Sequence, residues 1–451
     1  MAISSKKDAG TAVVRAAFGA PLAQQGRGFY VTLELLAICW GTPQGQPGTV
    51  LPRIEGGEVL RYARRSHDFA RRWMADQGLD DDDRLNVRGA SAEETLRTLL
   101  ASLRVPIPHQ RRSAPPSWGN QHLYPYIGEL VHYDSLDRRG KVSMERNTFR
   151  GGGGLAHKIL RTDPDEVRLS ANRAGLTNLV SEETGPLGRL AKALAHHDQA
   201  QVDPDFADRT ESEATVFPED RWVEHLRNGV RNITSRADTP RTKQVELLMH
   251  WVPFSIARHQ IDRAAIIEGR ELPSLPIAVD QNSGALRQAG RRQLDIARST
   301  VQAALRRTAE RLAESAVESD RHHLSALLEG GTWSDGPMQF LTGTLAAVGA
   351  LNAHTGRRHF TLSLPLIEAT VHASLAPGES VSFERFCEEI LSGELSLVVD
   401  PTSGARVRLT DDIDHGELAR NAAQLADELK GLGLLDEYSD ATRMVHAEVS
   451  R

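Results

Sequence analysis

The chain has 451 residues, a length that predicts about two to four domains at roughly 100 to 200 residues per domain. Hydrophobic residues make up 40% of it and charged residues 25%, which is typical of a globular protein. The two cysteines, Cys39 and Cys387, are too few and too far apart for a disulfide framework or a zinc knuckle. No run of about 18 apolar residues occurs and no signal-peptide pattern follows Met1, so we expect a cytoplasmic protein with no membrane partner.

The charge balance excludes a global cationic field. The formal net charge is −6, so any binding to nucleic acid must be local. Of the 54 basic residues only seven are lysines, and such an arginine bias is explained most simply by a GC-rich genome. Arginine abundance alone is therefore weak evidence for phosphate binding.

The predicted elements favour a mainly α protein (α+β) of several domains. We expect the following parts: residues 1–119, a mixed α/β domain; 120–239, an irregular segment with a glycine-rich loop; 240–357, a helical domain; and 358–451, a winged-helix-like domain.

Within the first and third parts, four segments carry the main predictions. The apolar stretch Phe29–Trp40 fits either a strand or a buried helix, whereas the spacing of apolar residues over Glu58–Gln77 predicts an amphipathic helix. Val245–Ile267 is strongly helical, with a kink expected at Pro253. A second helical stretch is predicted over residues 284–329, where Leu294 and several later apolar residues form one stripe.

The first half of that second stretch is the best candidate for nucleic-acid binding. Residues 284–311 hold seven arginines against Asp295 and Glu310, a local net charge of +5. The alternative is a solvated helix face, in which Arg306 pairs with Glu310. The arginines with fewer acidic neighbours, and hence our predicted nucleic-acid contacts, are Arg287, Arg291, Arg292 and Arg298.

From residue 364 the order of signals is helix, helix, strand, helix and hairpin: Leu364–Leu375, Phe383–Leu391, Leu395–Val399, Gly416–Leu432, then Leu434–Tyr438 with Arg443–Ala447. This order, and the closing run from Gly431 to Val445, resemble a winged helix-turn-helix domain over about a fifth of the chain. The resemblance implies that the third helix enters the major groove and that the hairpin touches the backbone, with Arg420, Arg443 and Lys430 as DNA contacts. Residues 401–451, however, hold ten acids and six bases, so a module for protein interaction or structure is the alternative.

Other patterns give weaker hypotheses. Four glycines at 151–154, flanked by Arg150, His157 and Lys158, could bind an anion through freed backbone N–H groups, but they lack the Walker pattern and also fit a turn. Residues 196–198, two histidines and an aspartate, could supply metal ligands, although adjacent side chains on a helix diverge. We predict no catalytic residue, no metal and no cofactor.

These observations lead to a functional hypothesis. We expect a non-enzymatic adaptor or accessory subunit of a bacterial multi-protein DNA-processing or defence complex, with other protein subunits as partners and DNA as a second candidate partner. An arginine-biased chain with a terminal winged helix and no enzyme motif resembles uncharacterised subunits of bacterial DNA-processing or phage-defence systems. The alternatives are a nuclease or other phosphoester hydrolase that uses His157 and Lys158 or His196, His197 and Asp198, and a stand-alone transcription regulator.

Overall fold

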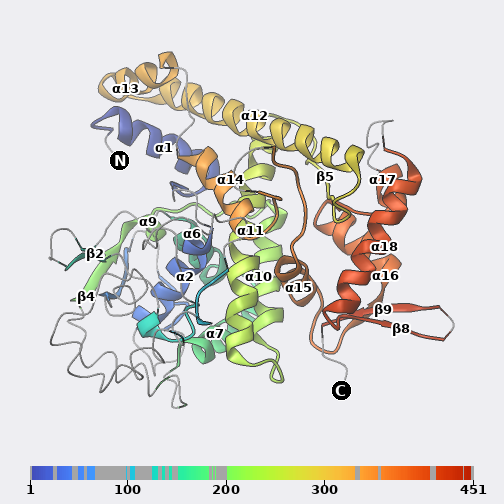
Figure 1. Ribbon diagram of the computed structural model, residues 1–451. Coiled ribbons are helices and arrows are strands. Elements are labelled where there is room, and N and C mark those ends of the chain that lie inside the picture. The colour runs from blue at the N-terminus through green and yellow to red at the C-terminus, as the bar shows by residue number, and fades with distance from the viewer. Residues whose placement is uncertain are drawn as a thin grey trace.

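Helices dominate the protein, as predicted for a mainly α fold (Figure 1). The structure is a computed structural model that describes residues 3–23, 28–42, 49–54, 58–66, 98, 102–106, 124–130, 135–137, 142–144, 151–181, 185, 188, 201–330, 336–353, 357–406, 413–439 and 441–447. Among these residues, no helix combines the length and hydropathy that a membrane crossing needs.

Helix α11 (Arg241–Ile267) stands at the centre of the fold (Figure 1). Most of its length is buried because helices surround it, and polar side chains such as Arg258 and Asp262 are buried along it together with the apolar ones. Pro253 lies inside the helix, where a kink was expected. The helices packed on α11 are α1 (Lys6–Phe18), α2 (Phe29–Gly41), α6 (Gly152–Arg161), α10 (Arg221–Thr234), α12 (Gly284–Ser315), α14 (Pro337–Ala347) and α15 (Leu364–Ser374).

The N-terminal half combines helices with short strands. The apolar stretch Phe29–Trp40, whose sequence fits either a strand or a buried helix, forms the helix α2. Residues 60–66, predicted as part of an amphipathic helix, instead form strand β1 (Leu60–Ser66), which pairs antiparallel with β4 (Gln201–Asp208). Every second side chain of β1 is buried, at Leu60, Tyr62 and Arg64. This period of two is that of a strand and not of a helix. The other elements here are η1 (Gly128–Leu130), the hairpin of β2 (Ser135–Asp137) and β3 (Val142–Met144), α7 (Glu166–Val180) and α9 (Arg209–Ser212).

The second predicted helical stretch is two helices. The 32-residue helix α12 ends at Ser315, and α13 (Glu318–Glu329) follows after two residues in extended conformation. This break turns α13 back onto α12 and α1, so that Leu324 is buried. In Figure 1, α12 crosses the top of the molecule, with α1 beneath it.

The C-terminal region places helices beside a three-stranded antiparallel sheet, in which β9 lies between β6 (Ser380–Ser382) and β8. The predicted hairpin is present as β8 (Leu435–Glu437) and β9 (Arg443–His446). The predicted strand near residue 397 is β7 (Leu397–Val398), which pairs parallel with β5 (Leu275–Pro276) outside this sheet. The remaining elements are α16 (Phe383–Arg385), the π-helix η2 (Phe386–Glu394), α17 (Pro401–Arg406) and α18 (His415–Gly431).

One hydrophobic core joins these parts. It extends from Ala9 in α1 to Ala447 after β9 and includes buried residues from all four segments into which the sequence was divided. The pairing of β1 with β4 likewise crosses the predicted boundary at residue 119. The C-terminal region therefore packs directly on the helical body.

Candidate nucleic-acid interface

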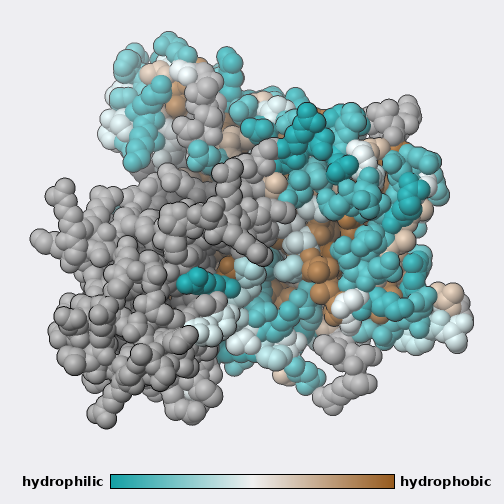
Figure 2. Space-filling view, in the orientation of Figure 1, coloured by the Kyte–Doolittle hydropathy of each residue, from teal (hydrophilic) through white to brown (hydrophobic). Residues whose placement is uncertain are grey.

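The arginine-rich helix α12 is held by its apolar stripe. Leu294, Val301 and Leu305 are buried, and Ser283 caps the helix by accepting a hydrogen bond from Leu286 N at 3.2 Å. The stripe directs the arginines to the flanks and the outer surface. Figure 2 shows that hydrophilic side chains cover α12 and α18 on this face of the molecule.

A second basic segment lies against the first half of α12. A Cβ on Gly290 would lie 3.1 Å from Phe360 N and 3.3 Å from His359 Cβ, so this glycine permits a close approach of the chain at 357–361. Backbone hydrogen bonds fix that chain, since Phe360 O accepts from Ala278 N at 3.1 Å. Arg357 and Arg358 are thereby placed beside the helix.

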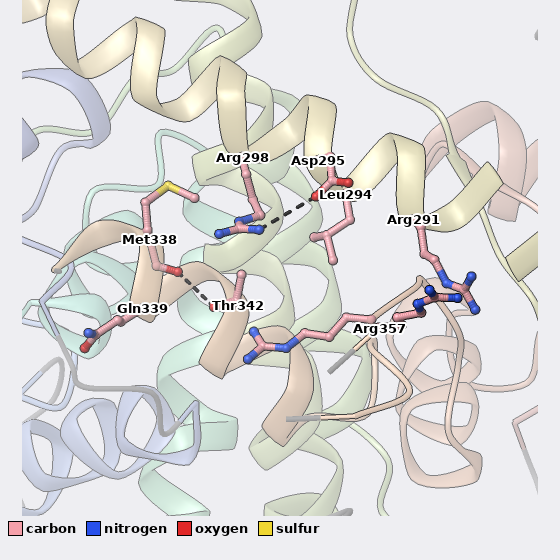
Figure 3. Close-up of a pocket in the computed structure, with 9 residues that line it drawn as sticks. Arg291, Leu294, Asp295, Arg298, Met338, Gln339, Thr342 and Arg357 are labelled. Atoms are coloured by element: carbon pink, nitrogen blue, oxygen red, sulfur yellow. Dashed lines mark hydrogen bonds and ion pairs between the residues drawn. The ribbon is translucent and has the colours of Figure 1, made fainter. Parts of the chain in front are cut away.

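The two segments and α14 enclose an open pocket of about 400 Å³. Figure 3 shows Arg298 and Asp295 projecting from α12 towards α14, while Arg357 extends towards Thr342. We call this site the arginine pocket, and its lining residues are Arg291, Leu294, Asp295, Arg298, Met338, Gln339, Thr342, Arg357 and Arg358.

The arginine pocket is strongly basic. Four arginines and one carboxylate line it, and Asp295 Oδ1 lies 3.7 Å from Arg298 Nη1. The Nε atom of Arg291 is buried and has no hydrogen-bond partner among the described residues. Burial and then the charge of Arg298 lower the pKa of Arg358, but a guanidinium in this range stays protonated at neutral pH. The pocket therefore keeps an excess of positive charge.

The pKa of His359, which follows Arg358 in the chain, is affected by the nearby arginines. The side chain is buried, and burial followed by the charges of Arg291 and Arg287 lowers its pKa to about 4. The imidazole is therefore neutral at pH 7, and an anion in the pocket would oppose the shift. The excess of positive charge makes the pocket a candidate site for an anion.

The structure assembles only part of the predicted contact set. Arg291 and Arg298 both line the pocket, whereas Arg287 and Arg292 do not. Arg287 Nε instead donates to Ser283 O at 3.2 Å, near the start of the helix. Sequence reasoning missed Arg357 and Arg358, and the predicted domain boundary fell between them. The adjacent arginine pair was the signal that could have found them.

In the C-terminal region, two of the candidate DNA contacts are engaged within the protein. Arg443 Nη2 donates to Glu384 Oε1 at 2.6 Å, and its guanidinium lies 4.4 Å from the centre of the Phe383 ring. Lys430 Nζ donates to Glu437 at 2.9 Å. Arg420 lies exposed on α18.

The glycine run at 151–154 begins helix α6 and packs against α2. Glu34 of α2 accepts hydrogen bonds from Gly151 N at 3.1 Å and Gly153 N at 2.8 Å, so a carboxyl group of the chain itself occupies the position where an anion would bind. The pKa of Glu34 is raised to about 8 by burial and then by Asp208, although these N–H groups lower it.

The basic residues near this run also bond internally. His157 is fully buried, with Nδ1 3.1 Å from Glu211 Oε1 and Nε2 3.1 Å from Val50 O. Lys158 Nζ donates to Ser212 O and Ala214 O, each at 2.6 Å. These contacts favour the structural alternative for the run. Arg150 and residues 196–198 lie outside the described residues, and the described part of the chain holds no cluster of three or more histidine, cysteine or acidic residues that could bind a metal.

Glu34 yields a pH prediction. Its folded pKa of about 8 lies above the ordinary 4.5, so the unfolded chain ionises first as the pH rises, and the fold loses stability between these values. We expect this loss to reach up to about 5 kcal/mol at 1.36 kcal/mol per pKa unit, and to be absent in Glu34→Gln. Urea unfolding from pH 5 to 9 measures it. A difference in unfolding free energy between wild type and variant that does not change with pH would contradict the assignment.

Comparisons with known proteins found no match among family models, curated proteins or solved structures.

Proposed function

We propose that the protein is a non-enzymatic, nucleic-acid-associated accessory subunit, and that the arginine pocket holds the phosphates. The observation that carries this proposal is the gathering of four arginines from two distant segments around one pocket with a single carboxylate. Guanidinium groups bind phosphate oxygens through paired hydrogen bonds, and such contacts position a protein on nucleic acid without regard to sequence. DNA processing or defence in a bacterial multi-protein complex is the setting that we propose for it.

We further propose that the C-terminal region is a winged helix. The chain order α15, β6, α16 with η2, α18, β8 and β9, and the sheet order β6-β9-β8, support it. The insertion of β7 and α17 before α18 departs from a simple winged helix.

The charges of this module favour a protein partner over DNA. Arg443 is paired with Glu384 and Lys430 with Glu437, so phosphate contact by either residue would compete with its ion pair, which leaves the exposed Arg420 as the third candidate contact. The winged helix would thus dock the subunit in its complex, while α12 faces the nucleic acid.

A salt titration of DNA binding tests the proposal. The pocket variant is Arg298→Ala/Arg357→Ala/Arg358→Ala, and its control removes the same charge from the second half of α12 in Arg306→Ala/Arg307→Ala/Arg311→Ala. We expect wild-type affinity to fall steeply with salt. In the pocket variant, the slope of log K against log salt should become shallower by about one for each phosphate that an arginine no longer neutralises. The control should keep most of the slope.

Circular dichroism and thermal unfolding check that both variants fold. Equal slopes in wild type and the folded pocket variant would refute the pocket as the phosphate site. Failure of the wild type to bind DNA even at low salt would refute the nucleic-acid role.

A further inference from the structure

The arginine pocket is recessed between helices. Its lining comes from α12, α14 and the segment at 357–358, and its apolar wall is formed by Leu294 and Met338, both of which are buried. Backbone phosphates of a duplex lie along an outer surface, whereas a recess between two helices admits a chain end or a small ligand. We propose that the pocket binds the terminal phosphate monoester of a nucleotide, either free or at the 5′ end of a strand.

The charge of the site favours a monoester over a bridging phosphate. A bridging phosphodiester carries one negative charge, but a phosphate monoester carries about −1.5 to −2 at pH 7 and offers three acceptor oxygens. Four arginines against Asp295 leave a formal charge of +3 in one pocket. The monoester matches this concentration of donors better.

The remainder of the pocket can hold the nucleoside. A volume of about 400 Å³ lies within the range of small-molecule sites and exceeds the need of a phosphate group alone. Gln339 is exposed at the rim and supplies an amide, and Asp295 supplies an acceptor for sugar hydroxyl or base amino groups. The Thr342 hydroxyl donates to Met338 O at 3.0 Å, which leaves its lone pairs as acceptors.

This inference rests on the proposed function, and its experiment separates the two. Fluorescence anisotropy of the full-length protein compares two single-stranded DNA oligonucleotides of one sequence, labelled at the 3′ end, with either a 5′-phosphate or a 5′-hydroxyl. Nucleoside 5′-monophosphates, the matching nucleosides and inorganic phosphate serve as competitors. The pocket variant and its matched control, defined above, are measured alongside.

We expect the 5′-phosphate to tighten binding at least about tenfold in wild type and control, and the preference to vanish in the pocket variant. Monophosphates should compete and nucleosides should not. Competition by inorganic phosphate as strong as that by monophosphates would overturn the assignment of a nucleoside to the pocket.

The other outcomes are distinct. Equal binding of both oligonucleotides, lost in the pocket variant, would overturn the terminal-phosphate inference and leave the nucleic-acid function standing. If no oligonucleotide binds but monophosphates bind in wild type and not in the pocket variant, measured by calorimetry, the inference holds for a free nucleotide and the proposed function falls. A 5′-phosphate preference that survives in the pocket variant would overturn the location.

Discussion

Replacement of Gly153 by alanine should destabilise the protein severely. A Cβ at this position would lie 2.5 Å from Leu35 N and closer still to Val31 O, both backbone atoms of α2. Backbone on the opposing helix cannot move aside as a flexible side chain can, so α2 and α6 must separate. Overpacking costs about 1–3 kcal/mol and occasionally more, and we expect a loss of at least about 3 kcal/mol in the free energy of unfolding.

The neighbouring glycine provides a matched control. A Cβ on Gly154 would meet atoms of Glu211 at 3.3–3.4 Å, a contact that a small shift relieves. Because alanine is favoured over glycine in a helix by about 1 kcal/mol, Gly154→Ala should be close to neutral. Urea unfolding of both variants measures the contrast. Similar unfolding free energies for the two would show that the helices are not packed as closely as described.

The close packing of α6 on α2 also decides what the glycine run contacts. Glycines followed by His157 and Lys158 are compatible with an anion loop, and the chain does place a carboxyl group there. That group belongs to Glu34, which lies 117 residues before Gly151 in the chain. The glycine run by itself could indicate that its N–H groups need a hydrogen-bond acceptor. It could not indicate that Glu34 of the same chain is that acceptor.

Helices with a long apolar stretch or an apolar stripe were predictable. The apolar stretch around Trp251 and the stripe through Leu294 specify α11 and one side of α12, because burial selects these patterns directly. The same stripe placed Arg291 and Arg298 on the flank of α12. Half of the arginines in the pocket could therefore be named from sequence.

The other half depends on long-range contacts. Arg357 and Arg358 reach the pocket because the bridge between Leu351 and Phe360 and the approach at Gly290 hold their segment against α12. The strand β1 has a similar origin, since it forms against β4 some 140 residues later, and buried Arg64 is accommodated by the Phe206 ring at 4.9 Å. In both cases the residues around the segment do not indicate which distant part of the chain it will contact.

Asn421 of α18 links this helix to the body of the protein. Asn421 is fully buried and satisfies four backbone groups of the β5 and β7 region. Its Oδ1 accepts from Val279 N at 2.8 Å and Asp280 N at 2.9 Å, and its Nδ2 donates to Ile277 O at 3.0 Å and Val399 O at 2.8 Å. Aspartate has the same size but lacks the two donors, so an amide of this length is needed to satisfy all four groups.

We expect Asn421→Ala to lower the free energy of unfolding by about 3 to 5 kcal/mol, because it leaves buried N–H and C=O groups unsatisfied. Gln424→Ala, on the exposed side of the same helix, should change it by less than about 0.5 kcal/mol. Urea unfolding and hydrogen exchange of the α18 amides measure both. Unchanged exchange in Asn421→Ala would contradict the anchoring role.

Asn421→Asp separates hydrogen bonding from packing. The carboxylate keeps the acceptor for Val279 N and Asp280 N but sets a second charged oxygen against the carbonyls of Ile277 and Val399. Repulsion in a buried site raises the pKa of this carboxyl above its ordinary value, so the variant should lose stability as the pH rises and regain part of it at acidic pH, where the protonated group donates to one carbonyl. A pH-independent difference from wild type would show that Asn421 acts through its shape alone. With the predicted pH dependence, the four hydrogen bonds are what orient α18, and with it the proposed winged helix, on the arginine-bearing body.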